Sequence, residues 1–374
     1  MIYLDNAATT LIKPPEVLEA AAEALRSMGS PGRGEHLAAR KAEETVFSCR
    51  EELAEMFGTG NPERVVLTFN ATHGLNIAIK SLVPHGGRVV ISGYEHNAVT
   101  RPLRAIGADV TVAKGPLFEP AAVLNAFDRA IVPGVDAVIC NHVSNVFGFV
   151  QPIGQIAELC KSRGVPLIVD ASQSAGVLPL ELHRLGAAFV AMPGHKGLYG
   201  PQGTGVLLCG EGVWPRTLLE GGTGSASRLA EMPEHLPDRL EAGTLNMPGI
   251  AGLLAGVRFL KRSGIWEICR KERLLALRTA EELNRLPGVR VFAGPGLPNQ
   301  TGVVSFTVEN REMELLAERL SRREIAVRAG LHCAPLAHQS AGTIDGGTIR
   351  VSFSCFNTLE EVDSLVSALK AEIS

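Results

Sequence analysis

The sequence predicts an α/β protein with one large, mainly parallel sheet and a second, smaller α+β domain. Short runs of valine, isoleucine and leucine alternate with helical stretches through the middle of the chain. These runs lack strict alternation of apolar and polar residues, which is typical of strands covered on both faces. The 374 residues suffice for two or three domains. We expect the large domain over residues 14–247 and the smaller one from residues 1–13 and 248–374.

The chain begins with two predicted helices. Residues 14–29 open with two prolines, whose fixed φ suits a first helical turn, and end at a glycine. The second helix, residues 36–58, follows a break rich in glycine and proline.

The central region supplies the predicted large sheet. We expect strands at residues 64–69, 88–93, 109–113, 137–143, 166–172, 188–194 and 205–210. Helices are expected between them at residues 72–83, 97–107, 120–127 and 153–164. The C-terminal part mixes helices at 250–264, 266–286, 313–323 and 358–373 with strands at 289–294, 302–308, 325–330 and 348–354.

Composition argues against several classes of function. The formal net charge is −3 and only 5% of residues are aromatic, so we expect no nucleic-acid partner. The seven cysteines are scattered without a CxxC pair, which fits neither a disulfide framework nor a zinc site. The start of the chain lacks a signal-peptide pattern, and the most apolar window stops at Arg258, too short for a membrane span. We therefore expect a cytoplasmic protein without metal or membrane attachment.

The strongest chemical signal is a lysine between two predicted buried strands. His195 and Lys196 lie in a glycine-rich turn. Burial lowers the pKa of an ammonium group, which suits a lysine that forms a Schiff base. The alternative is a solvated loop lysine beside glycines that only turn the chain.

Two weaker signals lie at the ends of other predicted strands. Asp170 ends a buried strand, where ligands of open α/β sheets bind, and its carboxylate would pair with a protonated pyridine nitrogen. A helix N-cap is the alternative for Asp170. Thr72 begins a helix after a short polar turn, whose free amides could hold a phosphate, although Thr72 could simply cap that helix. No dinucleotide-binding GxGxxG pattern occurs at this turn.

Nine motifs occur in order between Leu4 and Thr358: LDNAAT, NATHGLN, YEHNAV, SNVFG, VDASQSAG, GHKGLYGPQGTG, EAGTLNMPG, VRAGLHCAP and TIRVSFSCFNT. Together they resemble the class V aminotransferase group of pyridoxal-phosphate enzymes, in its cysteine desulfurase and selenocysteine lyase branch. The resemblance covers essentially the whole chain. It implies the fold of PLP-dependent transferases, known as fold type I, and pyridoxal 5'-phosphate as the cofactor.

The resemblance also implies a role for individual cofactor-binding residues. Lys196 would link covalently to the cofactor aldehyde, Asp170 would pair with the ring nitrogen and Gln173 would hydrogen-bond the phenolic oxygen. His96 would stack on the ring. The phosphate would be bound by the backbone of Ala71, by Thr72, by His195 and, from the partner subunit of a homodimer, by Thr244.

Substrate binding and the nucleophile are implied in the same way. Arg350, with Arg328 and Asn145 nearby, would hold the substrate carboxylate, because a guanidinium matches a carboxylate in a bidentate manner. Cys333 aligns with the nucleophile of the desulfurases and lies in a polar segment. The other cysteines are expected to be small core residues: Cys49, Cys140, Cys160, Cys209, Cys269 and Cys355.

Four positions depart from the family pattern. Pro193 stands where relatives often supply a serine hydroxyl to the phosphate, and Ala71 offers only its backbone. His73 replaces a common polar residue, and Gly197 looks like an extra residue after the lysine.

The segment between Cys333 and Arg350 is short, so we expect a sulfur acceptor, either a small thiol or a partner protein, to come to the cleft.

The expected activity is conversion of L-cysteine to L-alanine, with sulfur transferred to Cys333 as a persulfide. One alternative is a lyase for L-selenocysteine, since a pocket built around a thiol accepts a selenol. Another is a transaminase or epimerase of the same family in which Cys333 is incidental. A third is a non-catalytic scaffold that keeps the fold.

Overall fold

The computed structural model describes residues 1–32 and 34–373, and a seven-stranded sheet forms its centre. The strand order is β2 (Val65–Thr68), β8 (Gly205–Cys209), β7 (Phe189–Pro193), β6 (Leu167–Asp170), β5 (Ala137–Asn141), β3 (Arg88–Ser92) and β4 (Asp109–Ala113). β8 runs antiparallel to both of its neighbours, and the other pairs are parallel. The predicted α/β class with a mainly parallel sheet is therefore confirmed.

Helices cover both faces of this sheet. Alternate residues of β5 point to opposite faces, so Val138 joins one core and Ile139 the other. The first core contains residues of α2 (Leu37–Met56), α5 (Pro120–Ala130) and α6 (Ile153–Ser162). The second contains residues of α3 (Ala71–Leu82) and α4 (Asn97–Ala105).

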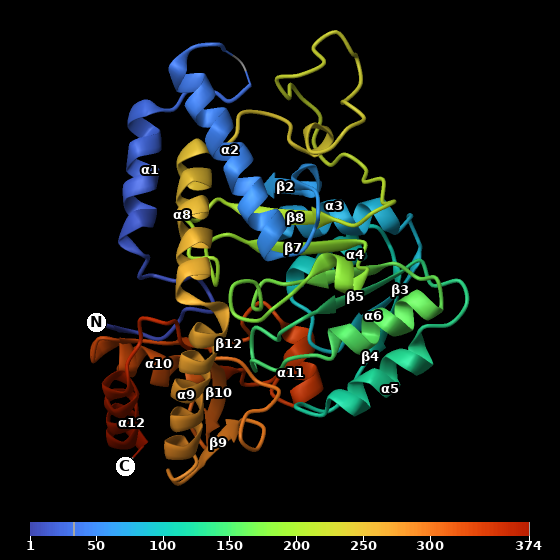
Figure 1. Cartoon of the computed structure of the whole chain (residues 1–374). Helices are drawn as coiled ribbons and strands as arrows, with labels where there is room; N and C mark the ends of the chain where they lie inside the picture. Colours follow the sequence, from blue (N-terminus) through green and yellow to red (C-terminus); the bar gives the residue numbers. More distant parts are fainter. Residues whose placement is uncertain (33, 374) are drawn as a thin grey trace.

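The C-terminal part forms a second, antiparallel sheet with its own core, seen at the bottom of Figure 1. Its strands lie in the order β12 (Arg328–Gly330), β13 (Thr348–Ser352), β10 (Val303–Val308) and β9 (Val289–Phe292). The accompanying helices are α9 (Ile265–Leu283), α10 (Met313–Arg322), α11 (Pro335–Ala341) and α12 (Leu359–Ile373). A parallel pair joins β1 (Ile2–Tyr3) to β11 (Ile325–Ala326), so the first strand lies against the C-terminal part of the chain.

Two predicted strands differ from expectation. β4 is the sheet edge, and four of its five residues are exposed, so it is not covered on both faces. The strand expected over residues 325–330 is two short strands, β11 and β12, which pair with different partners. Short elements also appear that the sequence pattern did not predict: α7 (Leu182–Leu185) and the 3-10 turns Pro62–Arg64 and Asp238–Leu240.

The helix α8 (Met247–Ser263) bears on the division into domains. It packs against α1 (Pro15–Ser27) and α2, and Figure 1 shows the three side by side. Ile250, Leu253 and Val257 belong to a core of the large sheet, whereas Leu275 and Leu283 of α9 belong to the core of the small one. The division at residue 247 stays a prediction, and we propose from these contacts that the boundary lies between α8 and α9. None of the described helices is long and apolar enough to span a membrane.

Candidate active site

A cavity of about 230 Å³ opens beyond the carboxyl ends of the central parallel strands. Strand ends at this edge are where open α/β sheets bind ligands. Every site residue predicted from the sequence lines this cavity except Thr244. Residues from both sheets meet there, since Asp170 is the last residue of β6 and Arg350 lies in β13.

Lys196 lies in the turn between β7 and β8 and lines the cavity. The hydroxyl of Thr10 donates to the carbonyls of His195 and Lys196 at 3.1 and 3.3 Å and fixes the turn. Gly197 follows because a Cβ there would lie 2.3 Å from the carbonyl oxygen of Ala175. Burial, together with the nearby Arg350, lowers the pKa of Lys196 to about 8. A fraction of the amine is thus in its neutral, nucleophilic form near physiological pH.

Asp170 ends β6 and is only 4% exposed, and one of its carboxylate oxygens accepts hydrogen bonds within the protein. Its Oδ1 accepts from the Ser172 amide at 2.9 Å and from the Ser172 hydroxyl at 2.5 Å. No α-helix begins at this turn, so the helix-capping alternative for Asp170 does not apply. The second oxygen remains available to a protonated ring nitrogen, as the family role requires.

The N-terminus of α3 closes another side of the cavity. The Asn70 side chain caps this helix by accepting from the His73 amide at 2.9 Å, while Ala71 and Thr72 line the cavity. The first amides of a helix have no partner within it and attract anions. Pro193 lines the same cavity, whereas the His73 ring stacks on Phe69, with ring centroids 4.8 Å apart.

His96 caps the N-terminus of α4, and this bond fixes its ring. Its Nδ1 accepts from the Ala98 amide at 3.0 Å, which places the ring proton on Nε2. Burial lowers the pKa of His96 and thereby favours the neutral ring. The adjacent amide of Asn97 donates to the Cys333 carbonyl at 2.8 Å. The ring expected to stack on the cofactor and the expected nucleophile are therefore joined through one backbone bond.

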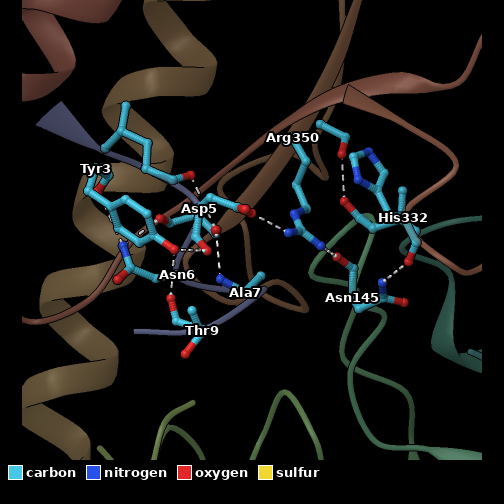
Figure 2. A network of polar contacts seen from close by, with 12 residues as sticks. Tyr3, Asp5, Asn6, Ala7, Thr9, Asn145, His332 and Arg350 are labelled. Atoms are coloured by element: carbon cyan, nitrogen blue, oxygen red, sulfur yellow. Dashed lines mark hydrogen bonds and ion pairs between the residues drawn. The ribbon is translucent and has the colours of Figure 1, made fainter. Parts of the chain in front are cut away.

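Arg350 is 2% exposed and is held from two sides, as Figure 2 shows. Its Nη1 donates to the Asn145 carbonyl at 2.9 Å, and its Nη2 pairs with Asp5 Oδ1 at 2.5 Å. The Asn145 amide donates onward to the His332 carbonyl at 2.8 Å. Among the described residues, Arg350 Nε and Asn145 Oδ1 have no hydrogen-bond partner. Arg328 is the neighbour of Arg350 across the β12–β13 pair. These groups form a cationic recess with spare donors.

Cys333 is exposed and lies between β12 and α11 on the cavity wall. Both His332 and Cys333 have positive φ, at 50° and 56°, a conformation that only the surrounding structure can hold for non-glycine residues. Burial and the neighbouring Arg350 lower the pKa of His332 to about 2, so the ring of the residue before Cys333 is uncharged.

Two of the remaining predicted residues lie differently. Gln173 lines the cavity, and its amide donates to the Ala7 carbonyl at 2.9 Å, which leaves one amide hydrogen for a ligand. Thr244 is exposed and lies outside the cavity, beside Glu241 and Leu245. Its expected contact with the phosphate of a partner subunit stays a prediction.

The segment Tyr3–Lys13 contributes contacts that the sequence reasoning did not assign. Asp5 pairs with Arg350, and Thr9 Oγ1 lies 2.9 Å from His195 Nδ1. Lys13 Nζ donates to the His195 carbonyl at 3.0 Å. The motif LDNAAT is the sequence signal for this segment; its contacts carry no local pattern, because each is made to a residue far along the chain.

The cavity fits pyridoxal 5'-phosphate in three respects. An amine of lowered pKa is present in Lys196, and a carboxylate with a free oxygen is present in Asp170. The N-terminus of α3 offers amides and the Thr72 hydroxyl to a phosphate. Pro193 has no hydroxyl and cannot make the phosphate contact that a serine often makes in relatives. The amides of α3 and His195 remain to bind the phosphate.

Known proteins resemble the chain along its whole length. The Aminotransferase class-V family matches residues 2–365. A probable cysteine desulfurase of Methanothermobacter thermautotrophicus is 32% identical over 99% of this chain and 94% of its own length. One of Xylella fastidiosa is 33% identical over 99% and 90%.

Solved structures agree with these relatives. An apo cysteine desulfurase of Thermococcus onnurineus superposes with a TM-score of 0.90 at 32% identity, covering 100% of this chain and 94% of the other. The cysteine desulfurase CsdA of Escherichia coli superposes with a TM-score of 0.86 at 27% identity, covering 99% and 94%. With the motifs gathered around one cavity and the likeness continuous from end to end, this chain belongs to the class V aminotransferase family of enzymes, which use pyridoxal 5'-phosphate.

Proposed function

We propose that the protein is a cysteine desulfurase, which converts L-cysteine to L-alanine and receives the sulfur on Cys333. The observation that carries this proposal is the exposed thiol of Cys333 on the wall of the cavity that also holds Lys196 and Arg350. A transaminase needs the amine and the carboxylate site but has no use for this thiol. The curated relatives named as probable cysteine desulfurases support the same activity.

Substrate binding follows from the charges of the cavity. Arg350, with Arg328 beside it, attracts the substrate carboxylate, and the spare Oδ1 of Asn145 can accept from the substrate. When bound, pyridoxal 5'-phosphate supplies an electron sink for the carbon that loses its proton. Asp170 keeps the ring nitrogen protonated, and the Phe189–Pro193 strand holds the turn that carries Lys196.

Lys196 and Cys333 carry the chemical steps. The neutral amine of Lys196 removes the proton from the substrate α-carbon, as its pKa of about 8 permits near neutral pH. The Cys333 thiolate attacks the substrate sulfur, so an S–S bond forms while the carbon–sulfur bond breaks. The electron pair of the broken bond stays on the β-carbon, which takes up a proton to become the methyl group of alanine, and the protonated Lys196 amine returns a proton to the α-carbon. A thiol acceptor then removes the outer sulfur from Cys333.

Three further features belong to this proposal. We propose a homodimer, because Thr244 is exposed and lies outside the cavity of its own chain. We propose a small thiol or partner protein as acceptor, because Cys333 is exposed at the cavity mouth. A cytoplasmic location is proposed on the cysteine pattern of the sequence.

Absorbance and product formation test the function. The purified protein should show the absorbance of the lysine-bound cofactor and form alanine from L-cysteine. Lys196→Ala should lose both properties, because no amine remains to bind the aldehyde. Cys333→Ser should keep the absorbance and lose the persulfide, detected by alkylation and mass spectrometry.

Cys355→Ser is the matched control, since Cys355 is half-buried with its thiol against Tyr199 and outside the cavity. It should keep absorbance, alanine formation and persulfide. Release of sulfide by Cys333→Ser at the original rate, or amino transfer to a keto acid in place of alanine formation, would contradict the proposed activity.

A further inference from the structure

The guanidinium of Arg350 has a resident partner that no sequence pattern assigned. Asp5 Oδ1 lies 2.5 Å from Nη2; the Arg350 side chain is buried at 2% exposed, and the Asp5 side chain is half-buried at 19%. The Asn145 carbonyl takes Nη1 on the other side. A guanidinium carries five N–H groups, so three remain after these two bonds. The one on Nε has no partner among the described residues.

The Asp5 carboxylate cannot easily leave this position, because its backbone is fixed. Asp5 forms a β-bridge with Ser352, two residues beyond Arg350. The Asp5 carbonyl accepts from the Ala8 amide at 3.0 Å, and Asn6 Nδ2 donates to the Ser352 carbonyl at 2.9 Å. Figure 2 shows Asp5, Asn6 and Ala7 arranged along one side of this network. The Asp5 carboxylate therefore has a fixed position along β13 and faces the Arg350 guanidinium.

Arg350 lies among other cationic groups of the cavity. Arg350, Arg328 and Lys196 all lie on its wall; both arginines lower the pKa of Lys196, and Arg328 lowers that of Arg350. Burial also lowers the pKa of Arg350, and Asp5 opposes that effect. Without an anion, Arg350 would lose both its counter-charge and the bond that fixes the rotation of its guanidinium plane.

We propose that Asp5 is a positioning residue for substrate recognition: it holds the guanidinium of Arg350 so that the spare N–H groups face the substrate carboxylate. This inference rests on the proposed function, because it assumes that Arg350 binds that carboxylate. Asp5 itself does not touch the substrate. Its expected effect is selective for ligands with a carboxylate, because the guanidinium that it holds is the group that binds the carboxylate.

A pair of ligands that differ only in the carboxylate separates positioning from general damage. L-Alanine carries the carboxylate, and ethylamine is the same amine without it. Both are titrated into the cofactor-loaded protein, and binding is followed by the change in cofactor absorbance. Asp5→Ala should weaken L-alanine binding by about tenfold or more, as expected when one charge-assisted hydrogen bond is lost. Ethylamine binding should not change.

Asp5→Asn is the conservative variant, because its amide oxygen can still accept from Nη2. It should bind L-alanine within about threefold of the original protein, since orientation is retained. Asp128→Ala is the matched control: Asp128 also pairs with an arginine, Arg163, but lies outside the cavity. It should leave both ligands unaffected.

The inference is overturned if Asp5→Ala binds L-alanine normally, if it weakens ethylamine equally, or if Asp5→Asn is as weak as Asp5→Ala. Failure of the proposed function gives a different result, because the unmodified protein would then form no alanine from L-cysteine. A protein that desulfurates L-cysteine while Asp5→Ala binds L-alanine normally would refute the role of Asp5 alone.

Discussion

The Lys196 amine shows how far a single residue depends on its neighbours. Its position between two buried strands allowed the sequence to predict a lysine of lowered pKa, and the structure gives a pKa of about 8. The Asp5–Arg350 pair could not be predicted, because the partners are 345 residues apart and neither sits in a helical or strand spacing with the other. The positive φ of Cys333 likewise has no sequence signal at its own position, since neither His332 nor Cys333 is a glycine or asparagine.

The pH dependence of Lys196 is a prediction at this scale. In cofactor-free protein only the neutral amine captures pyridoxal 5'-phosphate, so borohydride-trapped capture should rise with pH, with a midpoint at about 8. Burial is the largest cause of the lowered pKa and Arg350 the next. Arg350→Gln should therefore move the midpoint to higher pH. Arg104→Gln, on the exposed end of α4, is the control. An unchanged midpoint in Arg350→Gln would contradict this electrostatic account.

At the scale of elements, one buried ion pair fastens the long irregular segment between β8 and α8. Glu241 accepts from Arg50 through both oxygens, at 2.7 and 2.6 Å, and from the Leu67 amide at 2.7 Å. Arg50 also donates to the Val65 carbonyl at 2.6 Å. The segment is thereby tied to α2 and β2. The sequence predicted those elements from their apolar periodicity, but the tie depends on charged residues 191 positions apart, which carry no periodic signal.

Glu241→Ala should lower the free energy of unfolding by about 3–5 kcal/mol, because it leaves Arg50 buried and unpaired and the Leu67 amide unsatisfied. Urea unfolding followed by fluorescence measures this change. Glu231→Ala, an exposed residue of the same segment, should stay within about 0.5 kcal/mol of the original protein. A loss below about 1 kcal/mol for Glu241→Ala would show that the pair does not anchor the segment.

For the whole molecule, the order of β-branched runs and helices predicted the class of fold, because a parallel sheet buries both faces of its strands. It did not predict the strand order, which depends on how distant segments pair. Nor did it predict Glu272 in the interior. The charged pattern of α9 is typical of a solvated face, yet Glu272 is 5% exposed and packs beside Gly302. Burial raises the pKa of Glu272 to about 8.

This burial predicts a pH dependence of stability. Between pH 4.5 and about 8 the unfolded chain has lost the Glu272 proton while the folded protein keeps it. The contribution of Glu272 to stability is therefore fully present below pH 4.5 and is lost as pH rises toward 8. Glu272→Gln removes this dependence, so its stability relative to the original protein should rise across that range. Tm values measured at pH 5 and pH 8 test this sign. An equal Tm difference at both values would contradict it.

The ion pair between Asp5 and Arg350 also determines when this recess can form during synthesis of the protein. A ribosome makes the aspartate 345 positions before the arginine. A nascent chain therefore carries an incomplete recess over those 345 positions and can complete it only after the arginine has been added. Chains that stop before the arginine would contain Lys196 and Asp170 but would lack the guanidinium that binds the carboxylate of an amino acid.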